Sequence, residues 1–201
     1  MPGRDPADVA VLSIKMKGRP GENTPGRKVI VMKVYAAYGS NINLEQMAFR
    51  CPTGQVIGKG WLMDYQLMFL GTSARGCGVA TVEPRKGRRV PILLWAIDPE
   101  CEKALDRYEG YPTLYRKEAL PIFGITWTQN DISEMLAEVT EVPAMIYIMN
   151  QGHPAPPSVG YLDTIERGYR AVGFHVRYLA EGVRRTHRLK GKRSLVGGRV
   201  R

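Results

Sequence analysis

The sequence is poor in cysteine and lacks long apolar runs. Its three cysteines, Cys51, Cys77 and Cys101, are an odd number and form no Cys-x-x-Cys pair, which argues against a disulfide framework and a structural zinc site. We therefore expect a reducing, cytoplasmic setting. No segment approaches the roughly 20 consecutive apolar residues of a membrane helix. The first residues also lack an apolar stretch before a small-residue cleavage site, so we expect neither a membrane span nor a secretory signal.

Signatures of bound cofactors and metals are missing as well. The Gly-Cys-Gly of residues 76–78 has no further part of a dinucleotide fingerprint around it, and no phosphate-binding Gly-x-x-x-x-Gly-Lys-[Ser/Thr] loop occurs. His153, His175 and His187 do not show metal-ligand spacing. A Cys-His nucleophile is disfavoured because Cys101 lies on the apolar face of a predicted helix, where cysteine usually serves packing. We expect neither a metal nor a cofactor.

Acidic residues are absent from the C-terminal end. Residues 184–201 hold eight Lys or Arg and no acid, residues 1–31 carry a net charge of +3, and the whole chain carries +10. The intervening residues 32–183 are therefore close to neutral, with a net charge of −1. Runs of like charge are usually solvated, so we expect nucleic acid to meet this protein at most through weak contacts with its two basic ends.

The chain has 201 residues, which suits one domain. Residues 1–28 are rich in glycine and proline and show no sustained apolar period, which predicts a flexible basic leader. Residues 29–186 are expected to form the folded domain, and residues 187–201 to form a basic disordered tail.

Apolar periodicity predicts an α+β fold with a mixed, barrel-like sheet and flanking helices. Asn43 is expected to cap a short helix, and Asp98 followed by Pro99 to start a longer helix that ends at Gly110. On that longer helix Asp106 is expected to point away from the buried apolar face. The predicted strands are residues 29–38, 56–69 (as one strand or two), 79–82, 90–97, 115–123 and 144–149, and the predicted helices are residues 44–49, 99–109, 161–173 and 174–186.

A turn after the first predicted strand is one candidate for chemistry. Gly39, Ser40 and Asn41 interrupt the strand and precede a helix, and Gly39 permits backbone geometry that other residues resist. Such a turn can aim backbone N–H groups at one point and form an anion-binding concavity. Ordinary strand-to-helix connections have the same pattern, so spacing alone leaves the function of this turn open.

Glu109 is the second candidate. It lies four residues after Leu105, beside the apolar face and at the C-terminal end of its predicted helix. Partial burial and the negative end of the helix dipole would both raise the pKa of its carboxyl, which suits a base that must later act as an acid. Glu102 lies at a similar angle, so spacing does not choose between them, and a solvated glutamate is the ordinary alternative.

The two candidate segments occur in an order that resembles the γ-glutamylcyclotransferase-like (AIG2-like) family. The Tyr-Gly-Ser-Asn of residues 38–41 is similar to that family's substrate loop, and residues 105–111 are similar to the segment with its catalytic glutamate. Tyr115 follows at about the family's spacing. The resemblance extends over about residues 32–183 and includes residues 34–42, 78–82, 105–111, 144–150, 155–158 and 161–173.

The resemblance implies a cofactor-free enzyme that acts on a γ-glutamyl amine or peptide. The substrate's own α-amine would attack its γ-carbonyl, giving 5-oxoproline and a released amine. Glu109 would be the general acid/base, and backbone N–H groups of residues 39–41 would stabilise the developing oxyanion. Tyr38 and Tyr115 would be pocket walls or hydrogen-bond donors, and Tyr147 would line the same pocket.

The resemblance leaves several points open. Members of the family act on different γ-glutamyl amines, and the sequence does not choose among them. Arg50, Arg75 and Arg116 are all candidates for the arginine that meets the substrate α-carboxylate. The alternative function is a non-catalytic small-molecule binding protein of the same fold, with or without nucleic-acid attachment through its ends. The sequence also leaves open whether the protein forms a homodimer.

Overall fold

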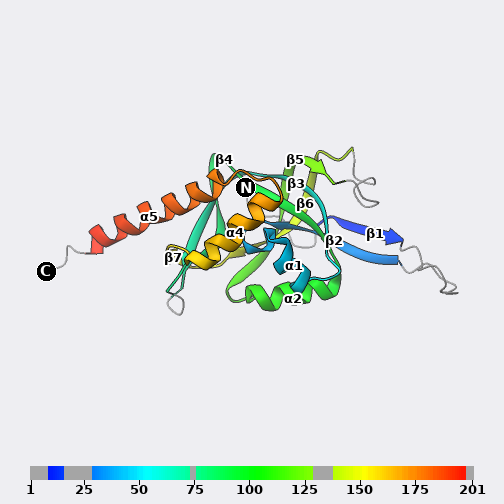
Figure 1. The fold of residues 1–201 in the computed structure, drawn as a ribbon, viewed down its shortest axis with the longest axis horizontal. Coiled ribbons are helices and arrows are strands. Elements are labelled where there is room, and N and C mark those ends of the chain that lie inside the picture. Colours follow the sequence, from blue (N-terminus) through cyan, green and yellow to red (C-terminus); the bar gives the residue numbers. More distant parts are fainter. Residues whose placement is uncertain (1–8, 16–28, 73–75, 129–137, 198–201) are drawn as a thin grey trace.

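The structure is a computed structural model that describes residues 9–15, 29–72, 76–128 and 138–197. In these residues one mixed sheet is flanked by four α-helices, which confirms the predicted α+β class (Figure 1). The elements follow in the order β1 (Val11–Lys15), β2 (Val29–Ala37), the 3-10 turn η2 (Ser40–Ile42), α1 (Leu44–Arg50), β3 (Gln55–Gly71), β4 (Val79–Ile97), α2 (Pro99–Glu109), β5 (Tyr115–Trp127), β6 (Glu141–Met149), β7 (His153–Pro154), α4 (Val159–Ala171) and α5 (Arg177–Gly197).

The sheet closes on itself. Its strands follow in the order β1-β2-β4-β3-β5-β6, and β7 is added to β3. All neighbours along this order are antiparallel, but β2 also pairs in parallel with β6 where Tyr35 meets Met145. Because this last pairing is a single residue pair, the sheet is a ring rather than a regular barrel.

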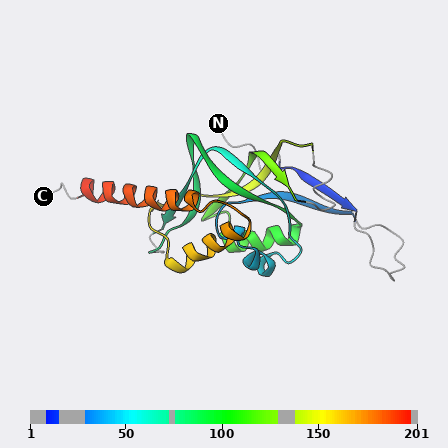
Figure 2. The same cartoon turned by 45° about the horizontal axis from the view of Figure 1, so that its top comes forward.

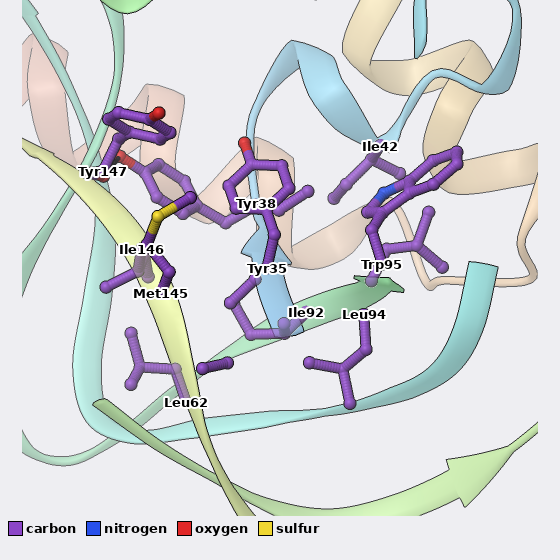
Figure 3. Close-up of a cluster of buried hydrophobic side chains, with 14 of the residues drawn as sticks. Tyr35, Tyr38, Ile42, Leu62, Ile92, Leu94, Trp95, Met145, Ile146 and Tyr147 are labelled. Atoms are coloured by element: carbon purple, nitrogen blue, oxygen red, sulfur yellow. Dashed lines mark hydrogen bonds between the residues drawn. The ribbon is translucent and has the colours of Figure 1, made fainter. Parts of the chain in front are cut away.

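The core lies inside this ring. Val34 of β2, Leu94 of β4 and Ile146 of β6 are fully buried, and Figure 3 shows side chains from β2, β3, β4 and β6 meeting there. The nearly continuous apolar run of β2 has the pattern of a strand that is covered on both faces. Helices α1, α2 and α4 lie together on one side of the sheet in both views (Figures 1 and 2).

Local capping signals place the ends of the helices beside the turn as predicted. The backbone N–H of Gln46 donates to Asn43 Oδ1 (3.1 Å) at the start of α1, and that of Cys101 donates to Asp98 Oδ1 (2.8 Å) at the start of α2. At the other end of α2, Gly110 adopts a left-handed φ of 65°, a conformation that favours glycine. Helix α2 therefore ends at Glu109.

The predicted leader and tail both contain regular structure. Strand β1 lies within the predicted leader and pairs with β2 from Val11–Lys33 to Lys15–Val29, whereas residues 1–8 and 16–28 lie outside the described residues. Helix α5 continues to Gly197, so the prediction of a disordered tail is wrong for residues 187–197. Once packing has started a helix, each further residue adds a hydrogen bond at little cost, and no proline interrupts this segment.

Two predicted strands are in fact one. The segments 79–82 and 90–97 belong to the single strand β4, whose register against β3 shifts between them. The polar residues of the segment between them hid this continuity, because they form a bulge rather than a loop. Among the described residues, no helix has both the length and the apolar content needed to span a membrane.

Candidate active site

One cavity collects all of the residues predicted for the site. It has a volume of about 120 Å³ and lies where the η2 turn, the end of α2 and the first residues of β4 and β5 meet. Its walls also include Tyr147, which was expected to line it. The described residues that line the cavity are Tyr35, Tyr38, Gly39, Ser40, Asn41, Val79, Ala80, Tyr108, Glu109, Leu114, Tyr115, Tyr147 and Tyr161.

The η2 turn leads the chain from β2 into α1. Its bonds run from the N–H of Ile42 to the carbonyl of Gly39 (3.1 Å) and from the N–H of Asn43 to the carbonyl of Ser40 (3.0 Å). The N–H groups of Ser40 and Asn41 precede these bonds, as the first N–H groups of any helix do. The turn therefore has two backbone donors that its own hydrogen bonds do not use.

Gly39 is suited to this turn by the space it leaves free. Its φ of −109° lies outside the left-handed region that favours glycine. A Cβ atom at this position would lie 3.1 Å from Ala80 Cβ and 3.6 Å from Tyr161 Oη. The first contact is tighter than ordinary van der Waals packing, so the absence of a side chain lets the turn approach β4 and α4 closely.

An amide holds Glu109 in place. Asn41 Nδ2 donates to Glu109 Oε1 (3.0 Å) and to Tyr35 Oη (2.8 Å). Arg50 Nη1 donates to Asn41 Oδ1 (2.6 Å). Because arginine can only donate, it fixes which end of the amide is the oxygen and turns the NH₂ group toward Glu109. The Arg50 guanidinium also stacks on Tyr108, 3.5 Å from the ring centroid.

Three tyrosines present their rings to the cavity while their hydroxyls are engaged elsewhere. Tyr38 donates to the carbonyl of Tyr147 (2.6 Å), and Tyr115 donates to the carbonyl of Ala80 (2.8 Å). Tyr147 donates to Asp106 Oδ1 (2.6 Å). Of the two roles expected for Tyr38 and Tyr115, this geometry favours that of a wall.

The hydroxyls of the buried tyrosines around the cavity remain protonated. Burial raises the pKa of Tyr35, Tyr38 and Tyr115 well above the usual value, and the negative charge of Glu109 raises all three further. Their hydroxyls therefore stay protonated at neutral pH and keep the hydrogen bonds described above. Glu109 is the only carboxylate among the described residues that line the cavity.

The other glutamate considered on α2 has different surroundings. Glu102 forms ion pairs with Lys117 (2.6 Å) and Lys33 (2.7 Å), and Lys117 also meets Asp106 (2.8 Å). Burial by itself would raise the pKa of Glu102, but the hydrogen bonds from the two lysines outweigh it and lower that pKa. The expectation that Asp106 points away is wrong, because Lys117 and Tyr147 both bind its carboxylate.

The remaining sequence candidates that the structure describes do not line the cavity. Of the arginines considered for the substrate carboxylate, Arg50 is next to the site, whereas Arg116 binds Glu118 (2.7 Å) and Arg75 lies outside the described residues. Cys101, the cysteine considered as a nucleophile, is buried and does not line the cavity. No group of three or more His, Cys, Asp or Glu is arranged to hold a metal ion within the described ranges.

Sequence reasoning missed part of the cavity lining, including Tyr35, Tyr108 and Tyr161, and the contact between Arg50 and Asn41. Tyr108 sits next to Glu109, and this adjacency was the only local signal. Tyr161 comes from α4, far along the chain, and binds the N–H of Ala80 (3.2 Å) through its hydroxyl. No sequence pattern connects residues separated by such a distance.

Comparison with known proteins agrees with this geometry. The family described as "Gamma-glutamyl cyclotransferase, AIG2-like" matches residues 35–171, a span that contains every lining residue of the cavity. The chain belongs to this family. The γ-glutamylcyclotransferase of Homo sapiens is 25% identical over 150 residues, which cover 72% of this chain and 74% of the human protein. That of Bos taurus is 25% identical over 151 residues, with the same coverage.

Solved structures share the fold. A crystal structure of a Homo sapiens protein described as uncharacterized has a TM-score of 0.61 and 25% identity, covering 78% of this chain and 85% of that one. A γ-glutamyl cyclotransferase structure has a TM-score of 0.60 and 24% identity, with the same coverage. Together with the family match and the curated relatives, these likenesses identify the chain as an enzyme of the cyclotransferase family.

Proposed function

We propose that this protein cyclises the γ-glutamyl group of a small amine or peptide, producing 5-oxoproline and a free amine, with Glu109 as its general acid/base. The observation that carries the proposal is the position of the Glu109 carboxylate in the cavity wall, held by Asn41 from the η2 turn. The relatives in Homo sapiens and Bos taurus are named γ-glutamylcyclotransferases, and this name supports the substrate class.

The reaction requires proton transfers that one carboxylate can serve. Glu109 takes a proton from the attacking α-nitrogen, whose lone pair then forms the new bond to the γ-carbonyl carbon. The bond between that carbon and the leaving nitrogen breaks as Glu109 returns the proton to the leaving nitrogen. The second proton that the α-ammonium must lose exchanges with solvent. No oxidant, reductant or cofactor enters this balance.

The η2 turn is suited to the negative charge that develops on the γ-carbonyl oxygen. The backbone N–H groups of Ser40 and Asn41 lie outside the hydrogen bonds of the turn and belong to residues that line the same cavity as Glu109. Donors that are fixed in advance cost no reorganisation when the charge appears, and losing one such donor typically costs about 2.7–4 kcal/mol.

The size of the cavity agrees with an intramolecular reaction. A volume of about 120 Å³ is well below the roughly 300 Å³ at which pockets for larger ligands begin. We infer that the cavity encloses the glutamyl group in a bent form and leaves the released amine at its mouth. Ring closure within one bound molecule then replaces much of the entropy cost of bringing two groups together.

A panel of γ-glutamyl amines and peptides, scored for 5-oxoproline, tests the proposal. The wild-type protein is expected to release 5-oxoproline from at least one substrate, and Glu109→Gln is expected to bind that substrate without turning it over. Glu100→Gln is the matched control, because Glu100 lies on the same helix and is largely exposed beside Lys103. Near-normal turnover by Glu109→Gln would exclude Glu109 as the acid/base. Binding of the substrates without turnover by the wild type would favour the binding protein.

A further inference from the structure

A basic bulge protrudes from the middle of β4, away from the cavity. Pro84 pairs with Tyr65 and Arg89 pairs with Met63, so residues 85–88 all lie opposite the single residue Asp64. The backbone N–H of Gly87 donates to Asp64 Oδ1 (2.7 Å), and Gly87 has a φ of 75°. These contacts fix the bulge, and the side chains of residues 85–89 are exposed.

Helix α5 is anchored on β3 beside this bulge. Arg185 Nη1 donates to the carbonyl of Leu67 (2.7 Å), and Thr186 Oγ1 accepts the N–H of Phe69 (3.1 Å). A Cβ atom on Gly182 would lie 3.2 Å from the Leu67 side chain, so the glycine lets the helix lie against the strand. Beyond this anchor α5 projects past the body of the protein in both views (Figures 1 and 2).

The bulge and the helix enclose a hollow that is lined by arginine. The hollow has a volume of about 160 Å³, and we call it the arginine cleft; it is lined by Arg88, Glu181, Arg184, Arg185 and Arg188. Glu181 is the only acid among these residues, and its contact with Arg88 is long, at 3.8 Å. Four guanidinium groups therefore face one carboxylate.

Like charges are crowded in this cleft. Burial lowers the pKa of Arg185, and the nearby charges of Arg88 and Arg85 lower it further, while Glu181 and Glu83 act in the opposite sense. An anion bound in the cleft would relieve this repulsion. Guanidinium groups donate in a planar fork that matches the oxygens of a phosphate.

We propose that the arginine cleft binds the phosphate backbone of a nucleic acid. Basic side chains continue beyond the cleft, where Lys86 and Arg89 of the bulge and Lys190 of α5 are also exposed. The basic surface is therefore longer than one phosphate group. This inference is independent of the cyclisation chemistry, and it places the contact between the bulge of β4 and the part of α5 where the basic C-terminal end begins. Recognition through phosphate alone predicts little dependence on base sequence.

The composition of α5 argues against a membrane surface as the partner. A helix that lies in a membrane interface buries a broad apolar face among the lipids. Along residues 177–191 of α5, whose side chains the structure describes, no large hydrophobic side chain is exposed; the exposed ones lie at Val11, Val31, Leu44, Phe49, Met63, Tyr108, Tyr111 and Val159.

Binding of labelled RNA and DNA oligonucleotides of about 20 residues, followed by fluorescence anisotropy between about 50 and 200 mM salt, tests this site. Arg184→Gln/Arg188→Gln is expected to weaken binding at least about tenfold at low salt and to reduce the slope of log Kd against log salt by about 2. The matched control is Arg167→Gln/Arg170→Gln, which removes the same charge from exposed positions on α4. Both variants are expected to keep the wild-type melting temperature and cyclotransferase activity.

Several outcomes would overturn the site. Equal weakening by both double variants would mean that net charge rather than the cleft carries binding. Absence of nucleic-acid binding by the wild type at low salt would remove the proposal. Tighter binding to phosphatidylserine vesicles than to either oligonucleotide would assign the surface to lipid, and tripolyphosphate binding as tightly as the oligonucleotides would reduce the cleft to a site for free phosphates. A preference for RNA or for DNA would show which of the two nucleic acids supplies the bound phosphate backbone.

Discussion

The two ends of helix α2 carry chemically identical side chains in opposite surroundings. Glu102 and Glu109 are seven residues apart, about two helical turns, so they face nearly the same way. Glu102 meets the ammonium groups of Lys33 and Lys117, whereas Glu109 accepts a hydrogen bond from the neutral amide of Asn41 at the cavity wall. The position of a carboxylate on the helix therefore says little about its role, and the groups it meets on neighbouring elements decide it.

The contrast has a chemical meaning. A carboxylate between two ammonium groups is held in its ionised form, and proton uptake would break both ion pairs. Such a group stabilises a fold but serves poorly as a carrier of protons. A carboxylate that is oriented by an amide, next to a space that a substrate can fill, is placed to exchange a proton with that substrate.

The largest expected effect is the loss of turnover in Glu109→Gln. Removal of a general acid/base typically costs about 10²–10⁴-fold in rate, and the amide of glutamine keeps the size of the side chain. We expect kcat for 5-oxoproline release to fall by that factor, with little change in thermal stability. Glu102→Gln, measured in the same assay, should keep most of the activity. A similar loss of kcat in both variants would break the distinction between the two glutamates.

For stability we expect the opposite order, with Glu102 contributing more than Glu109. Glu102→Gln removes the carboxylate that Lys33 and Lys117 share and leaves Lys117 with Asp106 as its remaining acidic partner. It should lower the free energy of unfolding by about 1–3 kcal/mol at neutral pH, measured by urea denaturation. Because the pKa of Glu102 is lowered in the folded state, its contribution is present above the ordinary glutamate value of 4.5 and is lost as the pH falls through the folded value. The gap between wild type and variant should therefore shrink in acid, and a constant gap would contradict this assignment.

Arg50 offers a third test, because it acts on Glu109 through Asn41. Arg50→Gln should release the Asn41 amide and lower kcat about tenfold, which corresponds to about 1.4 kcal/mol, while KM changes little. Arg116→Gln is the matched control, since Arg116 does not line the cavity. If KM rises while kcat is unchanged, Arg50 binds the substrate carboxylate and does not position Glu109.

The smallest effect is expected at Tyr147, which connects the cavity with the ion pairs around Glu102. Tyr147 lines the cavity and donates to Asp106, which in turn meets Lys117. Tyr147→Phe removes this hydrogen bond and should cost about 0.5–1.5 kcal/mol of stability, measured by thermal or urea unfolding, with kcat nearly unchanged. A loss of kcat comparable to that of Glu109→Gln would instead show that the ion-pair cluster and the cavity act as one unit.

Local sequence signals predicted the structure where the hydrogen bonds are local. The caps at Asn43 and Asp98 and the left-handed Gly110 involve residues only a few positions apart, and all three are present. The strands were found from a different signal, because strands that are covered on both faces have nearly continuous apolar runs even though their hydrogen-bond partners are distant. Where the structure differed, as in the bulge of β4 and the extent of α5, polar residues had no partner in the local sequence to reveal their conformation.

The sequence by itself determined most of the strands and helices in their order, the turn of residues 39–41 and a helix that ends at Glu109. Only the tertiary structure shows how the surroundings of Glu102 and Glu109 differ, because Lys33, Lys117 and Asn41 reach them from other elements. The closure of the sheet by Tyr35 and Met145 is likewise a contact between distant residues. Local backbone preferences act over a few residues, whereas the environment of a carboxylate depends on which strands and helices the whole fold brings against it.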